Sequence, residues 1–343
     1  MKNLTLLLTF TLSIIHCTGQ DIHFSQIMME PLNLNPALTG SFNGDQRASL
    51  NYKDQWTSFT SGFKTYSFNF DSKIIIGNAT LGAGINIFKD VAGEVQLGTT
   101  KGMASISSII DISQNQQITA GIQGGFAQKS LNPNALMWDD QYVNGGYDPT
   151  SISQELFSFE SFYYGDFSAG ISWNYQSAES NISSYDATFY ELGFAMHHIN
   201  RPGLKFTNEN ERLYTKYMIH GKGRIGVRYT DLSFQPSFLI AMQGPSKEIV
   251  AGTLLRLRMQ EASHFTGYFA ESAVAIGCHF RVGEAIIPSA MLEIGSFALG
   301  VSYDINVNGL RPASQLRGGM EISLRFINPS PFKYNRKGRN ASF

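Results

Sequence analysis

Ionisable side chains recur at alternate positions of several segments, and their types could serve acid–base chemistry. A histidine that a carboxylate orients beside a serine is the arrangement of a hydrolase. No serine in this sequence lies in a recognisable nucleophile elbow, so a catalytic interpretation has no motif behind it. We therefore predict that the chain is not an enzyme and that these residues pair as opposite charges in a narrow interior. The residues are Glu191, His197, Arg256, Arg258, His279, Arg281, Glu293, Asp304, Glu321 and Arg325.

Two further groups have the residue types of a metal site. His197 and His198 are adjacent, but neighbouring residues of a strand point to opposite faces, so they cannot share one ion without a bulge. We expect His198 at a membrane interface, next to a turn. The pair Asp139 and Asp140 lacks the ladder of alternate oxygens that a calcium loop requires. The sequence therefore predicts no metal ion and no cofactor.

The segments that carry these residues alternate apolar and polar side chains with a period of two. Residues 297–305 and 319–326 have this pattern without an error, which predicts two strands with one apolar face each. Similar segments make about 14 antiparallel strands in all. The others are 47–56, 65–71, 80–87, 102–111, 116–128, 163–176, 190–197, 213–229, 233–243, 248–260, 273–282 and 286–295.

The composition indicates what the apolar faces contact. Charged residues are 15% of the chain, where a soluble domain has about 25%, and aromatic residues reach 13%. The polar faces carry Gly, Ala, Ser, Asn and Thr, whereas a β-sandwich would present Lys and Glu to water. Short and long connections also alternate, as in outer-membrane proteins. The fold class predicted is all-β, a transmembrane antiparallel outer-membrane β-barrel; a soluble β-rich protein is the alternative.

The chain ends complete the predicted organisation. Lys2, an apolar run and then small residues predict a signal peptide over 1–19, and no later apolar run is long enough for a spanning helix. Residues 20–44 are expected to form a periplasmic N-terminal segment, 45–328 the transmembrane barrel and 329–343 a C-terminal tail. The net charge of -1 gives no general attraction to nucleic acid.

Short motifs follow one another along nearly the whole chain after the predicted cleavage site. They are QDIHFSQ at 20–26, PL at 31–32, NPALTG at 35–40, YKDQW at 52–56, DDQY at 139–142, the Gly, His and Pro segment at 193–202, the strand and turn at 236–245, YDIN at 303–306 and EISL at 321–324. As a set they resemble the PorP/SprF family of type IX secretion and gliding-motility outer-membrane proteins of Bacteroidota. Met320 departs from the histidine that is common in this family before the glutamate.

The resemblance implies a non-enzymatic barrel that works with the secretion machinery. Expected partners are the lipid bilayer, a secreted surface protein or the C-terminal region of an adhesin, and periplasmic components of the secretion or gliding machinery. A transport barrel for small or apolar solutes is the alternative. The candidate partner surface comprises Phe24 and Pro36 on the periplasmic side and Trp138, Asp139, Asp140 and Tyr142 outside.

Overall fold

The computed structural model describes residues 21–328 except 57–61, 133–134, 144, 149, 152–160, 178–186, 205–210, 261–270 and 308–316. The predicted signal peptide and C-terminal tail lie outside these residues. No helix in the described part of the chain is long and apolar enough to cross a membrane.

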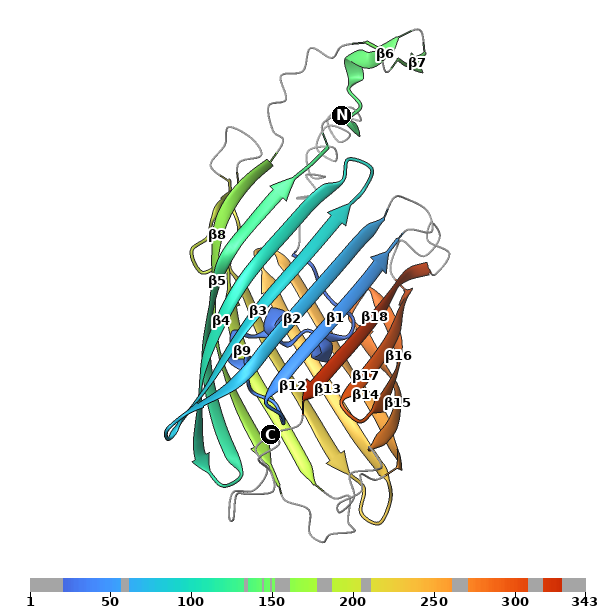
Figure 1. The fold of residues 1–343 in the computed structure, drawn as a ribbon. Helices are drawn as coiled ribbons and strands as arrows, with labels where there is room; N and C mark the ends of the chain where they lie inside the picture. Colours follow the sequence, from blue (N-terminus) through green and yellow to red (C-terminus); the bar gives the residue numbers. More distant parts are fainter. Residues whose placement is uncertain are drawn as a thin grey trace, which may run out of the picture.

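In the described chain, fourteen antiparallel strands close into one barrel (Figure 1). Each strand pairs with the next barrel strand along the chain, as in an up-and-down barrel. The strands are β1 (Gln46–Gln55), β2 (Phe63–Ile76), β3 (Ala79–Ala92), β4 (Leu97–Ser113), β5 (Gln116–Ser130), β8 (Ser161–Gln176), β9 (Thr188–His197), β12 (Lys216–Gly226), β13 (Leu232–Gln243), β14 (Ser246–Gln260), β15 (Ser272–Arg281), β16 (Ala285–Ile294), β17 (Phe297–Asn306) and β18 (Arg317–Asn328). The expected all-β antiparallel barrel is confirmed.

The first and last strands close the ring. β1 and β18 pair over their whole common length, with Leu50 opposite Leu324 and Lys53 opposite Glu321. The alternation of residues 319–326 predicts the strand, and the structure gives its partner. Every barrel strand of the described chain has a hydrogen-bonded neighbour on both sides, so the ring contains no free edge strand.

The alternation in sequence becomes an inside and an outside. On β17 the apolar positions Phe297, Leu299 and Val301 are 55%, 44% and 41% exposed. Ser302 and Asp304, which belong to the alternate set of positions on the same strand, are buried. The same contrast holds on the other long strands, so the barrel has an apolar outer surface and a polar interior. Such a surface is stable in hydrocarbon and not in water.

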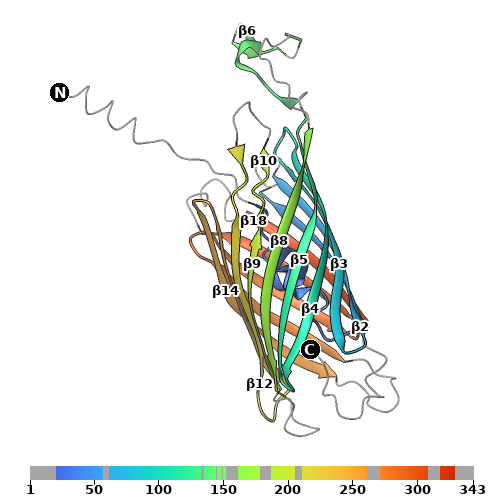
Figure 2. The same ribbon diagram turned by 90° about the vertical axis from the view of Figure 1, so that its left-hand side faces the viewer.

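The two open ends of the barrel differ. The long-loop mouth is the end that carries the connections 131–160 and 198–215, and the short-turn mouth is the end with the turns 77–78, 114–115 and 295–296. At the long-loop mouth, two small two-stranded sheets form: β6 (Tyr142–Val143) with β7 (Gly146–Tyr147), and β10 (Gly203–Leu204) with β11 (Glu211–Arg212). In Figures 1 and 2 the β6–β7 sheet projects beyond the barrel.

The N-terminal segment, residues 21–44, occupies the lumen (Figure 1). It folds into three short helical turns, η1 (Ile27–Met29), α2 (Pro31–Leu34) and η2 (Pro36–Leu38), two of which begin at a proline. It enters beside Gln243 at the long-loop mouth and leaves at Asp45, whose backbone bonds to Asn328 at the short-turn mouth. This differs from the separate periplasmic segment that the sequence predicted. The reason is that its side chains match the polar lumen.

The segment also brings a small apolar core into the lumen. Ile27, Leu34 and Leu38 are buried against inward-facing apolar side chains of the barrel wall, such as Met218 and Leu239. Burying this surface favours the docked position of the segment. The lumen is therefore packed by both polar and apolar contacts.

We expect Leu324→Arg, at the middle of the outward face of β18, to lower the free energy of unfolding by about 2–4 kcal/mol, because it places a charge in hydrocarbon. Val307→Arg, beside the long-loop mouth, is the control and should cost at most about 1 kcal/mol. Urea unfolding in lipid vesicles measures both. Equal costs at the two positions would contradict a lipid-facing outer surface.

Candidate functional site in the barrel lumen

Glu321 on β18 holds the start of the N-terminal segment. Its carboxylate accepts hydrogen bonds from the backbone N–H groups of Ser25 (2.6 Å) and Gln26 (3.0 Å) and from the Asn51 amide (2.8 Å). The carboxylate is buried, and a charged acceptor makes such bonds stronger than neutral ones. Glu321 therefore fixes the position of the chain as it enters the lumen.

Ser25 is the centre of a second group of contacts at the same level. Its hydroxyl donates to Asp304 (2.6 Å) and accepts from Arg281 (3.1 Å) and Lys53 (3.2 Å). Arg281 in turn forms ion pairs with Asp304 (2.9 Å) and Glu248 (3.1 Å). Because these charges are buried, each needs the others, and removing one would leave an unpaired charge inside the barrel.

The middle of the segment is fixed by Asn35, which is fully buried. Its side-chain oxygen accepts from the Ala37 backbone N–H and begins η2, while its amide donates to the Ile171 carbonyl (3.0 Å) and lies 3.0 Å from His220. The wall comes very close to η2: a Cβ on Gly82 or Gly121 would overlap backbone atoms of the segment. Glycine is required at these two wall positions to admit the segment.

The end of the segment is held near the short-turn mouth. Asp71 accepts two hydrogen bonds from Arg47 (3.0 and 2.7 Å) and one from the Gly40 N–H (2.7 Å). Arg47 also donates to the Leu38 carbonyl (2.9 Å), and Gly40 has a φ of 70°, which suits glycine. The segment is thus anchored at both ends and in the middle.

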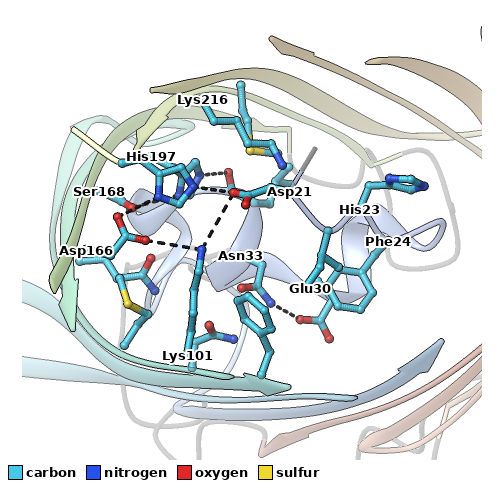
Figure 3. Close-up of a pocket in the computed structure, with 18 of the residues that line it drawn as sticks. Asp21, His23, Phe24, Glu30, Asn33, Lys101, Asp166, Ser168, His197 and Lys216 are labelled. Carbon is cyan, nitrogen blue, oxygen red and sulfur yellow. Dashed lines mark hydrogen bonds and ion pairs between the residues drawn. The ribbon is translucent and has the colours of Figure 1, made fainter. Parts of the chain in front are cut away.

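His198 departs from its predicted place. It is 2% exposed and does not lie at the membrane interface. Its φ of 57° ends the strand and turns the ring inward, where its two nitrogens contact Asp166 and Asp21. Lys101 also contacts Asp166 (3.5 Å), so this group ties the start of the segment to the wall (Figure 3). Both adjacent histidines therefore face the lumen, because the backbone leaves the extended conformation after His197.

The structure places the predicted charge network in the lumen, but as several groups. Arg256 pairs with Glu293 (2.6 Å), and Arg325 lies 3.5 Å from the same carboxylate. Glu191 pairs with Lys222 (2.9 Å), and Arg258 reaches Asp231 at the short-turn mouth (2.7 Å). These contacts are separate from the Arg281, Asp304 and Glu321 group described above.

Two predicted histidines bond to serine. His279 lies 2.7 Å from the Ser237 hydroxyl, and His197 lies 3.1 Å from that of Ser168. Among the described residues, no carboxylate lies within hydrogen-bond distance of either histidine, so neither pair has the third member of a hydrolytic triad. The described part of the chain also contains no group of three or more His, Cys, Asp or Glu that could hold a metal ion.

Sequence reasoning missed several residues of the network, namely Asp21, Glu30, Arg47, Lys53, Asp71, Lys101, Asp166, His198, His220 and Lys222. Arg47, Lys53, Asp71 and Asp166 lie on the polar side of alternating segments, so the period of two could have included them. Asp21 and Glu30 lie outside any strand pattern. Only the docking of the N-terminal segment brings them to the site.

Glu30 lies in this segment, outside the strands, and borders a pocket with about 790 Å³ of empty space, part of it open to solvent (Figure 3). One carboxyl oxygen accepts from Asn33, Ser67 and Asn69 (2.6–2.7 Å), while the other is buried without a hydrogen-bond partner among the described residues. Burial raises the pKa of Glu30 to about 7, although the three hydrogen bonds oppose this. Glu30 therefore takes up a proton near neutral pH.

The candidate partner surface divides into two places. Pro36 is buried and Phe24 lines the cavity, so these two hold the N-terminal segment and present no outer surface. Tyr142 is 59% exposed, and Asp139 and Asp140 are exposed in η4 (Asp139–Gln141) beside β6. Trp138 is half-buried at the start of this helical turn.

Comparison with known proteins identifies one family. A family model described as type IX secretion system membrane protein PorP/SprF matches residues 17–326. No curated protein matches the sequence. The match covers nearly all of the described chain, including the N-terminal segment and every barrel strand except the last two residues of β18.

Several solved structures are distantly similar. BamA from Haemophilus ducreyi lacking POTRA domains 1–3 is 11% identical, with a TM-score of 0.40 over 83% of this chain and 71% of that one. CdiB from Acinetobacter baumannii is 9% identical, with a TM-score of 0.40 over 82% of this chain and 60% of that one. A monoaromatic hydrocarbon channel, the TodX deltaS2S3 mutant, is 8% identical, with a TM-score of 0.46 over 87% and 94%. This chain thus spans less than two thirds of the CdiB chain.

We expect Glu30→Gln to remove a pH dependence of stability. The pKa of Glu30 is about 7 in the folded chain and 4.5 in a free side chain, so the folded state binds the proton more tightly. Its stabilising contribution is present below pH 4.5 and is lost as the pH rises to about 7, a change of about 3 kcal/mol. Chemical unfolding measures the free energy of unfolding across this range. As the pH rises, the value for the unaltered chain should fall by about 3 kcal/mol relative to that of the variant.

The control for this experiment is Glu94→Gln, in the exposed turn between β3 and β4. It should leave the pH profile of the free energy of unfolding unchanged. A Glu30→Gln profile parallel to that of the unaltered chain would show that Glu30 is ionised throughout.

Proposed function

Since the chain belongs to the PorP/SprF family of type IX secretion system membrane proteins, we propose that it is a non-enzymatic outer-membrane barrel of this system. In this role it binds and localises a secreted surface protein, such as an adhesin, and contacts periplasmic components of the machinery. One observation carries the proposal: the N-terminal segment crosses the lumen and is anchored to the wall at both ends. A barrel filled in this way suits a binding platform better than an open pore.

The orientation proposed places the long-loop mouth outside the cell. Outer-membrane barrels have longer connections outside and shorter turns on the periplasmic side. The connections 131–160 and 198–215 are the longest in the chain, and 77–78, 114–115 and 295–296 are among the shortest. The short-turn mouth, with the C-terminal end of β18, then faces the periplasm.

The projecting part of the long connection supports a binding surface for the secreted partner. Met137 and Tyr142 are 61% and 59% exposed there, close in sequence to the exposed carboxylates Asp139 and Asp140. Trp138 begins the helical turn, and the Tyr142 and Tyr147 rings lie 6.0 Å apart across β6 and β7. Aromatic and methionine side chains are enriched in protein interfaces.

We expect Tyr142→Ser to reduce surface delivery of the secreted partner severalfold, because it removes an exposed aromatic anchor and leaves the barrel unchanged. Quantitative proteomics of the cell surface and the culture medium measures this. Tyr229→Ser is the control, since Tyr229 is 95% exposed in the turn between β12 and β13 at the opposite mouth. Equal delivery in both variants would contradict the proposed outer surface.

We expect the purified full chain to give no steady conductance in planar lipid bilayers, because residues 21–44 cross the lumen. Glu321→Gln removes the charged acceptor of two backbone N–H groups and should produce intermittent openings. Glu94→Gln serves as the control. Steady single-channel currents from the unaltered chain would favour the alternative function, a transport barrel for small or apolar solutes.

A further inference from the structure

A second cavity, the lower cavity, lies between the N-terminal segment and the short-turn mouth. It has about 1660 Å³ of empty space and is lined on one side by Met28, Met29 and Phe42 of the segment. Its remaining walls come from the ends of strands near the short-turn mouth, including Gln176, Thr188 and Ile327. None of the functions proposed above uses this cavity.

Positive charge gathers around the lower cavity. Arg47, Arg224 and Arg325 line the lower cavity, and Arg256 shares the Glu293 carboxylate with Arg325. Asp71 neutralises Arg47, and Arg256 lies between Glu293 (2.6 Å) and Glu271 (2.8 Å). Lys222 is paired with Glu191 (2.9 Å).

Among the described residues, these five cations face four carboxylates, so one positive charge has no counter-charge. Arg224 is exposed, lines the cavity and makes no hydrogen bond or ion pair with any described residue. Within the described chain, the ion pair of Arg325 is a 3.5 Å contact with Glu293, a carboxylate that Arg256 already holds at 2.6 Å. A guanidinium group offers a planar set of donors that fits a carboxylate with two parallel hydrogen bonds. A carboxylate would supply both of these hydrogen bonds to either arginine.

Apolar side chains line the space between the arginines. Met28, Met29 and Met291 present flexible thioethers. Phe189, on the barrel wall, also lines the cavity. Methionine surfaces adapt to more than one apolar side chain. The cavity thus offers contacts for apolar groups and for carboxylates together.

The barrel limits how a ligand can reach this site. Its wall is a closed ring of hydrogen-bonded strands, so a lipid in the bilayer has no lateral path into the lumen. The N-terminal segment, anchored at Asp71 and Glu321, obstructs the path from the long-loop mouth. A ligand therefore enters along the barrel axis through the short-turn mouth.

We infer that the lower cavity is a binding site for an acidic peptide segment, whose carboxylates pair with Arg224 and Arg325 and whose apolar side chains contact Met28, Met29 and Met291. The cavity presents cations and apolar groups together, which matches a peptide that carries both carboxylates and apolar side chains. A simple anion would contact the cations alone. This inference rests on the proposed function, in which the barrel contacts other proteins of the machinery, and it names one contact.

Fluorescence anisotropy of the purified full chain tests the inference. The probe is a fluorescein-labelled peptide of alternating Glu and Leu, and the comparison is the same peptide with Gln in place of Glu. We expect the acidic peptide to bind, the Gln peptide to bind at least roughly tenfold more weakly, and binding to weaken with added salt. Arg224→Gln and Arg325→Gln should each weaken acidic-peptide binding roughly tenfold or more.

The two variants should fold, since Arg224 has no ion pair to lose within the described chain and Glu293 keeps Arg256 after Arg325→Gln. Arg201→Gln, exposed at the long-loop mouth, is the matched control and should bind as the unaltered chain does. Equal binding by Arg224→Gln, or equal binding of the two peptides, would overturn the inference. So would binding of inorganic phosphate, measured by calorimetry, without binding of the acidic peptide.

Measuring the delivery of secreted proteins to the cell surface distinguishes failure of this inference from failure of the proposed function. If cells that lack the chain deliver secreted proteins to the surface normally, the proposed function is wrong. If those cells lose delivery and the double variant Arg224→Gln with Arg325→Gln restores it fully, the proposed function stands and the acidic-peptide site is wrong. Loss of delivery with the double variant, and restoration with Arg201→Gln, would support both.

Discussion

Charge pairing in a space that excludes most water is the constraint on which the interior of this protein depends. Glu321, Asp304 and Asp71 are buried at the wall, where an isolated carboxylate would be costly. Each is satisfied by an arginine, a lysine or a backbone N–H group, and many of those donors belong to the N-terminal segment. The wall and the segment therefore stabilise one another, and neither arrangement is complete alone.

This mutual dependence divides the lumen. The segment crosses the lumen from Asp21 to Asp45 and separates two cavities. The cavities differ in the charged residues that line them. The cavity of about 790 Å³ contains Glu30, whose protonation depends on pH near neutrality, whereas the lower cavity is lined by arginines with incomplete partners. The two mouths thus present different chemistry.

Much of the fold could be predicted because a transmembrane-type strand has a strict physical pattern. The alternation in residues 297–305 and 319–326 indicated two strands, and the apolar positions indeed face outward. The charged residues on the polar positions lie in the lumen for the same reason, since the side-chain period of a strand is two. The pattern failed at His198, where a left-handed backbone conformation turned the expected outward residue inward.

The sequence by itself determined the all-β antiparallel strands, including the last two, and the face on which each alternating residue lies, because these follow from local periodicity. Only the tertiary structure decided where residues 21–44 lie, which carboxylate holds which cation and where charge is left over. These depend on contacts between positions far apart in the chain, such as Ser25 with Glu321 and Arg325 with Glu293. Local patterns carry no information on contacts between residues far apart in the chain. The place of the N-terminal segment and the partners of the arginines are therefore defined only by the closed barrel.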